Sequence, residues 1–451
     1  MIAEAALARG IGHLLPDFLL RQRWYGAGER QLEGVKLVEL EILRTDEPLL
    51  AWVLAEARFA TGDPSTYQVL VGLRPLAATE RFLEGKGRAF LGDLDTDAGP
   101  ALAYDALVDP ELCLALLRHV YPEDPVSLVR PLNLEQSNTS IVYDERLIMK
   151  VFRRLNEGRN PDVEVTAALA RVGFEHISPP VVDWTYKGRD LAVVREFLVG
   201  ASDGWQLALT SLRDLYDRRL DPAQSGGDFA PECRRLGEIT GAMHVALAEA
   251  FGTAGGDPAA WAEAMHAHLA RVPSDTEGAT FDAVGVAERY DAVAELDDVG
   301  QAIRVHGDYH LGQTMRADAG WFVLDFEGEP QLPVAERRLP SSPLRDVAGM
   351  LRSFHYAAQS GLAERADEVD EELLGLARAW EDRAAGAFLR GYLQADGVDA
   401  LLPADPAART AVLDAFVLSK AVYEVGYELA NRPDWARIPL SAVDRLVGTS
   451  P

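Results

Sequence analysis

The chain has 451 residues, 48% of them apolar, and a formal net charge of −27 from 71 acidic and 44 basic residues. This length exceeds one typical core, so two or three subdomains are expected. The acidic balance argues against nucleic acid or anionic membranes as partners, because phosphate groups are bound by clustered Lys and Arg. Cys113 and Cys233 form neither a disulfide framework nor a zinc pattern, which fits a reducing cytoplasm. No signal peptide and no membrane span is predicted, so we expect a cytoplasmic protein.

Residues 1–95 are predicted to form a small, mostly antiparallel β module. A short helix is expected at 3–15, followed by a compact polar and aromatic turn, Arg21-Gln-Arg-Trp-Tyr-Gly26. Alternating apolar and polar side chains, bounded by turn residues, then predict strands at 35–43, 50–60 and 67–73. Nothing in this module points to chemistry.

Residues 96–200 are predicted to form a second subdomain. A helix is expected at 110–121, and strands are expected at 127–132, 140–143, 146–153 and 191–197. The loop at 135–140 joins the first two of these strands and contains no glycine. The side-chain hydroxyls of Ser137, Thr139 and Ser140 could donate to phosphate oxygens. An ordinary polar hairpin turn explains this loop equally well.

Lys150 lies inside the apolar strand Leu147-Ile-Met-Lys-Val-Phe152. An unpaired charge is costly to bury, so this Lys needs a partner. The helix predicted to begin near Asp162 offers Glu164, which is our candidate. A Lys at a strand edge that points to water is the competing interpretation.

Residues 201–451 are predicted to be mostly helical, with amphipathic helices at 232–251, 344–354 and 371–394. His244 on the first of these helices is expected to be a packed or capping histidine. Asp346 lies near the start of the second helix. It either accepts hydrogen bonds from a neighbouring loop or is simply a favourable charge at a helix N-terminus, and the sequence does not separate the two.

The most informative stretch is His306-Gly-Asp-Tyr-His-Leu-Gly-Gln313, followed by Trp321-Phe-Val-Leu-Asp-Phe-Glu327. It places Asp308 on a short loop, Gln313 five positions later, and Asp325 at the end of a short apolar strand. Phosphoryl transfer from ATP needs a carboxylate that accepts the proton of the attacking hydroxyl, and an amide and a second carboxylate that hold Mg²⁺. The order and spacing of these residue types therefore indicate a phosphotransferase.

The catalytic loop of protein kinases has a similar order, His-Arg-Asp, four residues, Asn, and then Asp-Phe-Gly. Gly307, Gln313 and Glu327 replace the Arg, the Asn and the last Gly. By this comparison Lys150 would contact the ATP phosphates and pair with Glu164, and the hydroxyls of the 135–140 loop would lie over the phosphates. The backbone at the end of the 191–197 strand would pair with adenine, through Glu196 and Leu198.

A long helix is predicted between Asp405 and Asn431. One of its faces changes from apolar residues to charged and aromatic ones, which are Lys420, Tyr423, Glu424, Tyr427 and Glu428. Carboxylates can bind sugar hydroxyls, and aromatic rings can cover the apolar faces of pyranose rings. An exposed helix end with an ion pair between positions 420 and 424 explains the pattern equally well.

Taken together, the chain resembles the actinobacterial maltokinases, which belong to the superfamily of protein kinases and aminoglycoside phosphotransferases. The resemblance covers essentially the whole chain. The kinase core motif identifies only the superfamily, whereas the Arg21-Gln-Arg-Trp-Tyr25 and Lys420-Ala-Val-Tyr-Glu424 segments are much more specific. Further segments that carry the resemblance are Gln136–Ser140, Lys150–Arg154, Asn160–Asp162, Gly226–Phe229, Asp325–Pro330 and Ser342–Ala348.

The resemblance implies an α+β, bilobal, protein-kinase-like fold with a cap subdomain at 1–95, a nucleotide-binding subdomain at 96–200 and a helical C-lobe at 201–451. It implies ATP-dependent phosphorylation of maltose to maltose 1-phosphate, a precursor for α-glucan (glycogen) synthesis. Asp308 would be the catalytic base, Gln313 and Asp325 would hold Mg²⁺, and Lys150 would contact phosphates. The sugar would be bound by Tyr423, Glu424, Tyr427 and Glu428. We expect a monomer whose partners are maltose and ATP.

Two other functions compete with this one. The first is a glucosamine kinase, or another aminosugar or aminoglycoside kinase, of similar architecture. Asp325-Phe-Glu-Gly and the Lys420-Ala-Val-Tyr-Glu segment favour maltose over glucosamine. The second is a non-catalytic, kinase-like sugar sensor, against which the intact residues Lys150, Asp308, Gln313 and Asp325 argue.

Overall fold

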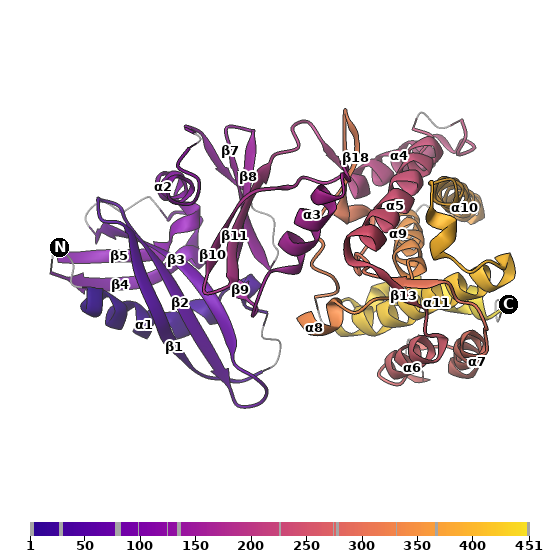
Figure 1. Cartoon of the computed structure of the whole chain (residues 1–451), viewed down its shortest axis with the longest axis horizontal. Helices are drawn as coiled ribbons and strands as arrows, with labels where there is room; N and C mark the ends of the chain where they lie inside the picture. Colours follow the sequence, from indigo (N-terminus) through magenta and orange to yellow (C-terminus); the bar gives the residue numbers. More distant parts are fainter. Residues whose placement is uncertain are drawn as a thin grey trace. The chain divides into compact units, whose positions relative to one another are not determined.

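A computed structural model describes residues 4–26, 30–76, 83–97, 99–123, 125–132, 137–224, 227–273, 275–276, 279–330, 332–365 and 369–448. The chain divides into two compact units. The first comprises residues 1–164 and 178–199, and the second comprises residues 165–177 and 200–451. The first unit is rich in β-strands and the second is mostly helical, which confirms the predicted α+β class (Figure 1).

The first unit contains a six-stranded antiparallel sheet in the order β1-β2-β3-β5-β4, with β9 paired to β3. Helix α1 (Glu4–Leu20) packs against β1 and β4 and buries Leu7, Ile11, Leu15 and Phe18, whose spacing of three and four residues places them on one helix face (Figure 1). The strands are β1 (Leu32–Arg44), β2 (Leu49–Phe59), β3 (Ser65–Pro75), β4 (Phe90–Thr96), β5 (Gly99–Asp105) and β9 (Arg154–Leu155).

Three strands of this sheet, β4, β5 and β9, were not predicted from the sequence. The expected subdomain boundary at residue 95 lies inside β4, and β4 pairs with β5 from Thr96 and Gly99 onward. The six-stranded sheet therefore extends beyond residue 95, to Asp105. Residues 90–105 show little regular alternation of polar and apolar side chains, and Gly92 and Gly99 interrupt the pattern.

A second, five-stranded antiparallel sheet has the order β10-β11-β8-β7-β6. Helix α2 (Pro110–Val120) contributes to the same apolar cluster as the inner strands. Lys150 lies on the central strand, opposite Ser140 on one side and Val193 on the other. The strands are β6 (Val129–Pro131), β7 (Asn138–Tyr143), β8 (Leu147–Phe152), β10 (Pro180–Tyr186) and β11 (Arg189–Glu196).

The second unit is built around helices that pack closely enough to require glycine. A Cβ atom at Gly391 on α10 would lie 2.0 Å from the Arg234 carbonyl oxygen on α5, and one at Gly237 would lie 2.0 Å from the Phe388 carbonyl oxygen. Helix α3 (Pro161–Arg171) begins in the first unit and ends in the second. The other helices are α4 (Gly204–Arg218), α5 (Ala230–Phe251), α6 (Pro258–Leu269), α7 (Ala283–Ala294), α8 (Val334–Arg337), α9 (Leu344–Ala363), α10 (Glu371–Leu393), α11 (Pro406–Asn431) and α12 (Arg437–Val447).

Short strands and 3-10 turns complete the second unit. The apolar strand predicted before Asp325 is β18 (Gly320–Val323), which pairs with β17 (Thr314–Ala317), and β17 pairs with β12 (Ser202–Asp203). Strand β16 (Gln301–Ile303) pairs with β13 (Thr253–Gly255) and leads into the His306–Gln313 stretch, whose end forms η5 (Leu311–Gln313). Helix α12 follows the helix at 406–431 and was not predicted from the sequence.

Candidate active site

The loop that carries Asp308 is held by a buried carboxylate. Asp346, in the first turn of α9, accepts hydrogen bonds from the backbone N–H groups of His306 at 2.7 Å and Gly307 at 2.9 Å. Of the two interpretations of Asp346, the structure therefore supports the one in which its carboxylate accepts hydrogen bonds from the neighbouring loop. Burial alone would raise the pKa of Asp346, but its hydrogen bond to His244, nearby imidazole charge and the loop amides lower it. Asp346 therefore remains ionised and holds the loop.

His244 is a packed histidine, as predicted. Its Nε2 lies 3.2 Å from Asp346 Oδ2, and its Nδ1 lies 3.0 Å from the Tyr392 hydroxyl. The side chain is fully buried. Its two ring nitrogens are thus occupied by structural partners, and the residue supports the loop indirectly through Asp346.

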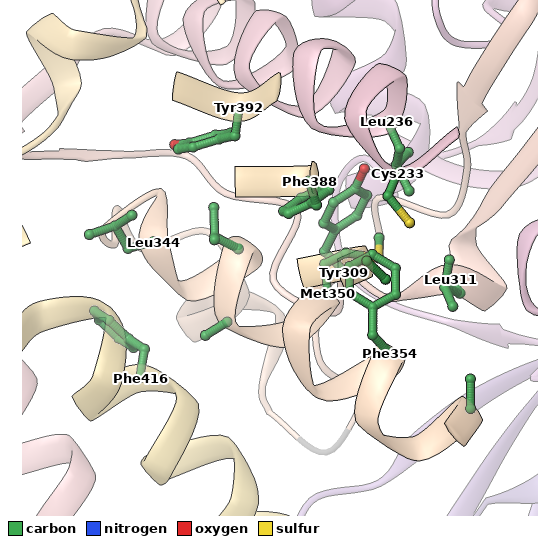
Figure 2. Close-up of a cluster of buried hydrophobic side chains, with 14 of the residues drawn as sticks. Cys233, Leu236, Tyr309, Leu311, Leu344, Met350, Phe354, Phe388, Tyr392 and Phe416 are labelled. Carbon is green, nitrogen blue, oxygen red and sulfur yellow. The ribbon is translucent and has the colours of Figure 1, made fainter. Parts of the chain in front are cut away.

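Tyr309, the neighbour of Asp308, anchors the loop from the other direction. Figure 2 shows its ring among buried side chains that include Cys233, Leu236 and Phe354. Its hydroxyl lies 2.8 Å from Thr240 Oγ1. A Cβ atom at position 349 of α9 would lie 2.5 Å from the Tyr309 carbonyl oxygen, so the loop can lie on α9 only because that residue is glycine.

The Asp308 carboxylate has two basic neighbours. Lys420 Nζ on α11 lies 3.7 Å from Oδ1, and His310 Nε2 lies 4.0 Å from Oδ2. Burial lowers the pKa of His310, an effect that the carboxylates of Asp308 and Asp325 oppose. Lys420 is thus the nearer of the two basic neighbours of Asp308. The Asp308 carboxylate is suitably placed to serve as a general base.

Gln313 and Asp325 are brought together by the backbone. The N–H of Leu324 donates to the Gln313 carbonyl oxygen at 2.9 Å, so the end of η5 lies beside the residue that precedes Asp325. Asp325 has a φ of +62°, in the left-handed region that non-glycine residues seldom adopt and that often marks a functional position. An amide oxygen and a carboxylate oxygen suit Mg²⁺.

These two residues would not form a complete metal cage. Within the described ranges, no group of three or more His, Cys, Asp and Glu side chains is arranged to hold a metal ion. Mg²⁺ usually keeps water and phosphate oxygens and takes only one or two protein carboxylates. The donor set of Gln313 and Asp325 fits a Mg²⁺ ion that arrives with a nucleotide, and the assignment remains a prediction.

A pocket of about 630 Å³ opens beside Asp308, within the second unit. Its walls come from α6, α11, the loop that carries Asp308 and residues 329–345. Two pairs of rings border it, Trp261 with Phe416 at 5.7 Å between centroids, and His268 with Tyr423 at 6.2 Å. Polar groups from the same walls include Asp257, Arg271, Asp308, Glu329, Arg345 and Lys420.

Glu329 organises the polar side of this pocket. It is buried and accepts a hydrogen bond from Arg345 at 3.1 Å. Burial, followed by the neighbouring Glu329 and Asp308 carboxylates, raises the pKa of the Tyr423 hydroxyl, which therefore stays protonated as a donor. Neither Glu329 nor Lys420 was predicted as a site residue. Both lie in the segments that carried the family resemblance, which was the available signal.

The four predicted sugar-binding residues of α11 lie in different places. Only Tyr423 is among the residues that line the described pocket. Glu424 accepts two hydrogen bonds from the buried Arg352, at 2.7 and 2.9 Å, rather than pairing with Lys420. Glu428 is buried, with contacts to the Tyr356 hydroxyl at 3.2 Å and to Arg432 at 2.7 Å. Tyr427 is 42% exposed.

The four residues therefore do not line the described pocket together. Helix α11 turns by about 100° per residue, so Tyr423 and Glu424 point to different neighbours. The sugar-binding role of Glu424 and Glu428 rested on the family resemblance and on their chemistry, and it stays a prediction. In the structure both carboxylates stabilise the contact of α11 with α9, and only Tyr423 lines the described pocket.

Lys150 has an acidic partner on α3. Its Nζ lies 3.5 Å from Asp162 Oδ2, and Arg195 Nη2 lies 3.0 Å from the same oxygen. Asp162 precedes the predicted partner Glu164 by two positions on the same helix. The phosphate-binding role of Lys150 and the role of Glu164 remain predictions.

The loop predicted to lie over the phosphates is described only from Ser137 onward, and its residues 135 and 136 lie outside the described part of the chain. Ser137 is exposed, and Ser140 lies on β7 opposite Lys150. Thr139 Oγ1 accepts a hydrogen bond from Arg153 Nε at 2.8 Å.

The predicted adenine-binding segment follows β11. The carbonyl oxygen of Glu196 accepts a hydrogen bond from the Ser178 hydroxyl at 2.8 Å, and the N–H of Phe197 donates to the carbonyl oxygen of Arg146. Leu198 is partly exposed just beyond the strand. A carbonyl oxygen has two lone pairs, so the segment retains acceptor capacity, and its role remains a prediction.

Comparison with known proteins decides the family. Residues 18–109 match the maltokinase N-terminal cap domain. The glucosamine kinase of Streptacidiphilus jiangxiensis is 33% identical over 336 residues, which are 71% of this chain and 74% of that protein. This chain is a maltokinase-like member of the protein kinase-like superfamily. The predicted resemblance is confirmed at that level, and the chain is a kinase-like sugar phosphotransferase.

Solved structures agree with the fold of this maltokinase-like protein. A glucosamine kinase structure, crystal form B, is 25% identical, with a TM-score of 0.67 over 98% of this chain and 99% of that one. A glucosamine kinase in complex with glucosamine, ADP and inorganic phosphate is 23% identical, with a TM-score of 0.63 over 96% and 98% of the two chains. In the described part of the maltokinase-like chain, no helix is long and apolar enough to cross a membrane.

Proposed function

We propose that this protein uses ATP and Mg²⁺ to phosphorylate maltose to maltose 1-phosphate. The observation that carries the proposal is the ring-bordered pocket of about 630 Å³ with the Asp308 carboxylate in its wall. Pockets that bind small molecules combine apolar and aromatic walls with a few convergent polar groups. ATP use is supported by a related glucosamine kinase that was solved with ADP.

The mechanism assigns each residue a separate task. Asp308 accepts the proton of the anomeric hydroxyl as that oxygen bonds to the γ-phosphorus, while the bond from the γ-phosphorus to the bridging oxygen breaks and ADP leaves. Asp346 holds the loop in position through the His306 and Gly307 amides. Lys150 contacts the phosphates. Mg²⁺, held by Gln313 and Asp325 together with phosphate and water oxygens, would neutralise the charge that develops on the phosphates.

Two observations support a neutral disaccharide as the acceptor. Lys420 places an ammonium group 3.7 Å from the catalytic carboxylate, which disfavours an acceptor that brings a second ammonium group to that position. The two ring pairs, Trp261 with Phe416 and His268 with Tyr423, provide separate apolar surfaces in one pocket, as two linked pyranose rings require.

Glucosamine is the second candidate, because the relatives of this chain include glucosamine kinases. An aminosugar needs a carboxylate that is available to its ammonium group. Two of the acidic residues that line the pocket have basic neighbours: Glu329 is bound to Arg345, and Asp308 lies beside Lys420. These pairings favour the neutral sugar.

Lys420→Met tests the choice of acceptor, with Lys420→Arg as the matched control that keeps the charge. We expect Lys420→Met to raise the ratio of kcat/KM for glucosamine to that for maltose by about fivefold or more, since two like charges near 4 Å in water repel by ~1 kcal/mol. Lys420→Arg should keep the ratio close to that of the wild type. An unchanged ratio in Lys420→Met would remove the electrostatic argument for maltose.

A further inference from the structure

The chain passes directly from the strand of Lys150 into the cap sheet. Strand β8 ends at Phe152, and β9, at Arg154 and Leu155, pairs with β3 of the six-stranded sheet. Arg153 lies between them with 2% of its surface exposed. Its Nη2 forms an ion pair at 2.6 Å with Asp105, at the end of β5. A buried charge at this junction needs such a partner.

Arg153 also contacts the two motifs on either side of it. Its Nε donates to Thr139 Oγ1 at 2.8 Å, on the strand that follows the predicted phosphate loop. Its guanidinium lies 5.0 Å from the ring centre of Trp24, in the Arg21–Tyr25 turn. The Trp24 ring is held in turn by Phe18 at 6.0 Å and Tyr67 at 6.1 Å.

Attachment of the cap sheet to β8 and β11 does not itself require these contacts. Gln68 on β3 donates from its side chain to the carbonyl oxygens of Phe152 and Leu191, each at 2.5 Å, and its own backbone N–H bonds to the Arg153 carbonyl. The Trp52 indole N–H fixes the Gln68 side chain at 3.0 Å. What the Arg153 side chain adds is a fixed contact to Thr139.

We propose that Trp24 and Arg153 are positioning residues for nucleotide binding. Through them the cap region orients Thr139, and with it the Ser137–Ser140 segment that would contact the phosphates of ATP. The inference rests on the proposed ATP-dependent function and on no particular acceptor sugar. It gives the Arg-Trp-Tyr turn, to which the sequence assigned no chemistry, a role in the reaction.

The test measures the Kd of Mg·ATP by titration calorimetry, together with the KM values for ATP and for the acceptor. Thr139→Val removes the acceptor of the Arg153 hydrogen bond and keeps the buried Arg153–Asp105 pair. Trp24→Leu removes the ring beneath the guanidinium. We expect each to raise the Kd of ATP by about fivefold to tenfold, since each tenfold corresponds to ~1.4 kcal/mol, and to leave the acceptor KM unchanged.

The effect of combining Trp24→Leu with Thr139→Val shows whether Trp24 acts on ATP binding through Thr139. If Trp24 acts through Thr139, the double variant should bind ATP about as weakly as Thr139→Val alone. Arg154→Met is the matched control, because Arg154 is the exposed next residue and its guanidinium donates to Ser65 rather than to Thr139. It should leave the Kd of ATP unchanged. Melting curves of all variants verify that they fold.

Three results would overturn the inference: an unchanged ATP Kd in folded Trp24→Leu, fully additive effects of the two substitutions, or equal increases in the KM values of both substrates. Failure of the proposed function is seen separately, in the wild type. A wild type that binds ATP but prefers another sugar changes only the substrate, whereas one that binds no ATP rejects both proposals.

Discussion

Among single residues, the proposed phosphoryl transfer depends most on Asp308. Its carboxylate lines the pocket. Its loop is held by the hydrogen bond from the Gly307 amide to Asp346 and by the hydrogen bond between the Tyr309 and Thr240 hydroxyls. Asp308→Asn keeps the size of the side chain and removes the proton acceptor. We expect kcat to fall by ~10²-fold or more, the scale of general-base loss, while ATP binding persists.

The matched control for Asp308→Asn is Asp318→Asn, the same change at an exposed position in the hairpin between β17 and β18. Steady-state kinetics and ATP calorimetry on both variants check the expectation. Near-normal turnover in a correctly folded Asp308→Asn preparation would show that another group accepts the proton.

The two neighbours Tyr423 and Glu424 should separate binding from stability. Glu424 is the partner of buried Arg352, so Glu424→Ala leaves a cation without its counter-charge. We expect it to destabilise the protein by about 3–5 kcal/mol, visible as a lower Tm. Tyr423→Phe, on the pocket side, should instead raise the acceptor KM with little change in Tm. The reverse pattern would restore Glu424 as a sugar ligand.

These residues also show what a sequence can and cannot predict about the site. Asp308, Gln313 and Asp325 could be found because their spacing along one short stretch mirrors the chemistry. Glu424 was indistinguishable from a sugar ligand, because its partner Arg352 lies on another helix. Glu329 and Lys420 converge on the pocket only in the folded chain, from elements about ninety positions apart.

At the scale of elements, three helices of the second unit meet at Glu381 on α10. Its carboxylate is bonded to His355 Nδ1 on α9 at 2.9 Å and to Arg445 on α12 at 2.8 Å. Burial alone would raise the pKa of Glu381, but the hydrogen bonds and charges of His355 and Arg445 lower it to about 2. The ionised carboxylate thus ties α12 to the core.

This lowered pKa predicts a pH dependence of stability. A carboxyl group whose pKa is lower in the folded state stabilises it above the unfolded pKa of about 4.3, and the contribution is lost as pH falls toward 2. Glu381→Gln should therefore lower the Tm at pH 7, and the difference from the wild type should shrink between about pH 4.5 and 2. Parallel melting curves that keep a constant difference would contradict this.

The elements themselves were largely predictable where one period dominates the pattern. Helices at 230–251, 344–363 and 371–393, and the strands β1 to β3, follow clear apolar repeats. Strands β4 and β5 were missed because glycines interrupt their alternation. Helix α12 was missed because the helix at 406–431 ends with an Asn, Arg and Pro sequence that resembles the close of a domain.

In the whole molecule, the two units carry different parts of the proposed site. The first carries Lys150, the Ser137–Ser140 segment and the cap sheet joined to them at Arg153, while the second carries the Asp308 loop and the pocket beside it. The family and the sugar kinase-like character follow from comparison with relatives. The acceptor sugar depends on a few pocket side chains, so overall similarity to glucosamine kinases does not determine it.

The acceptor preference of the wild-type protein is the sharpest test of the proposed reaction. Purified chain is mixed with ATP and Mg²⁺, and ADP release is measured with maltose, glucose, glucosamine or no sugar, with the product identified by phosphorus NMR. We predict no ADP without sugar, maltose 1-phosphate as product, and a kcat/KM for maltose about tenfold or more above that for glucosamine. A higher kcat/KM for glucosamine would contradict the account of the pocket.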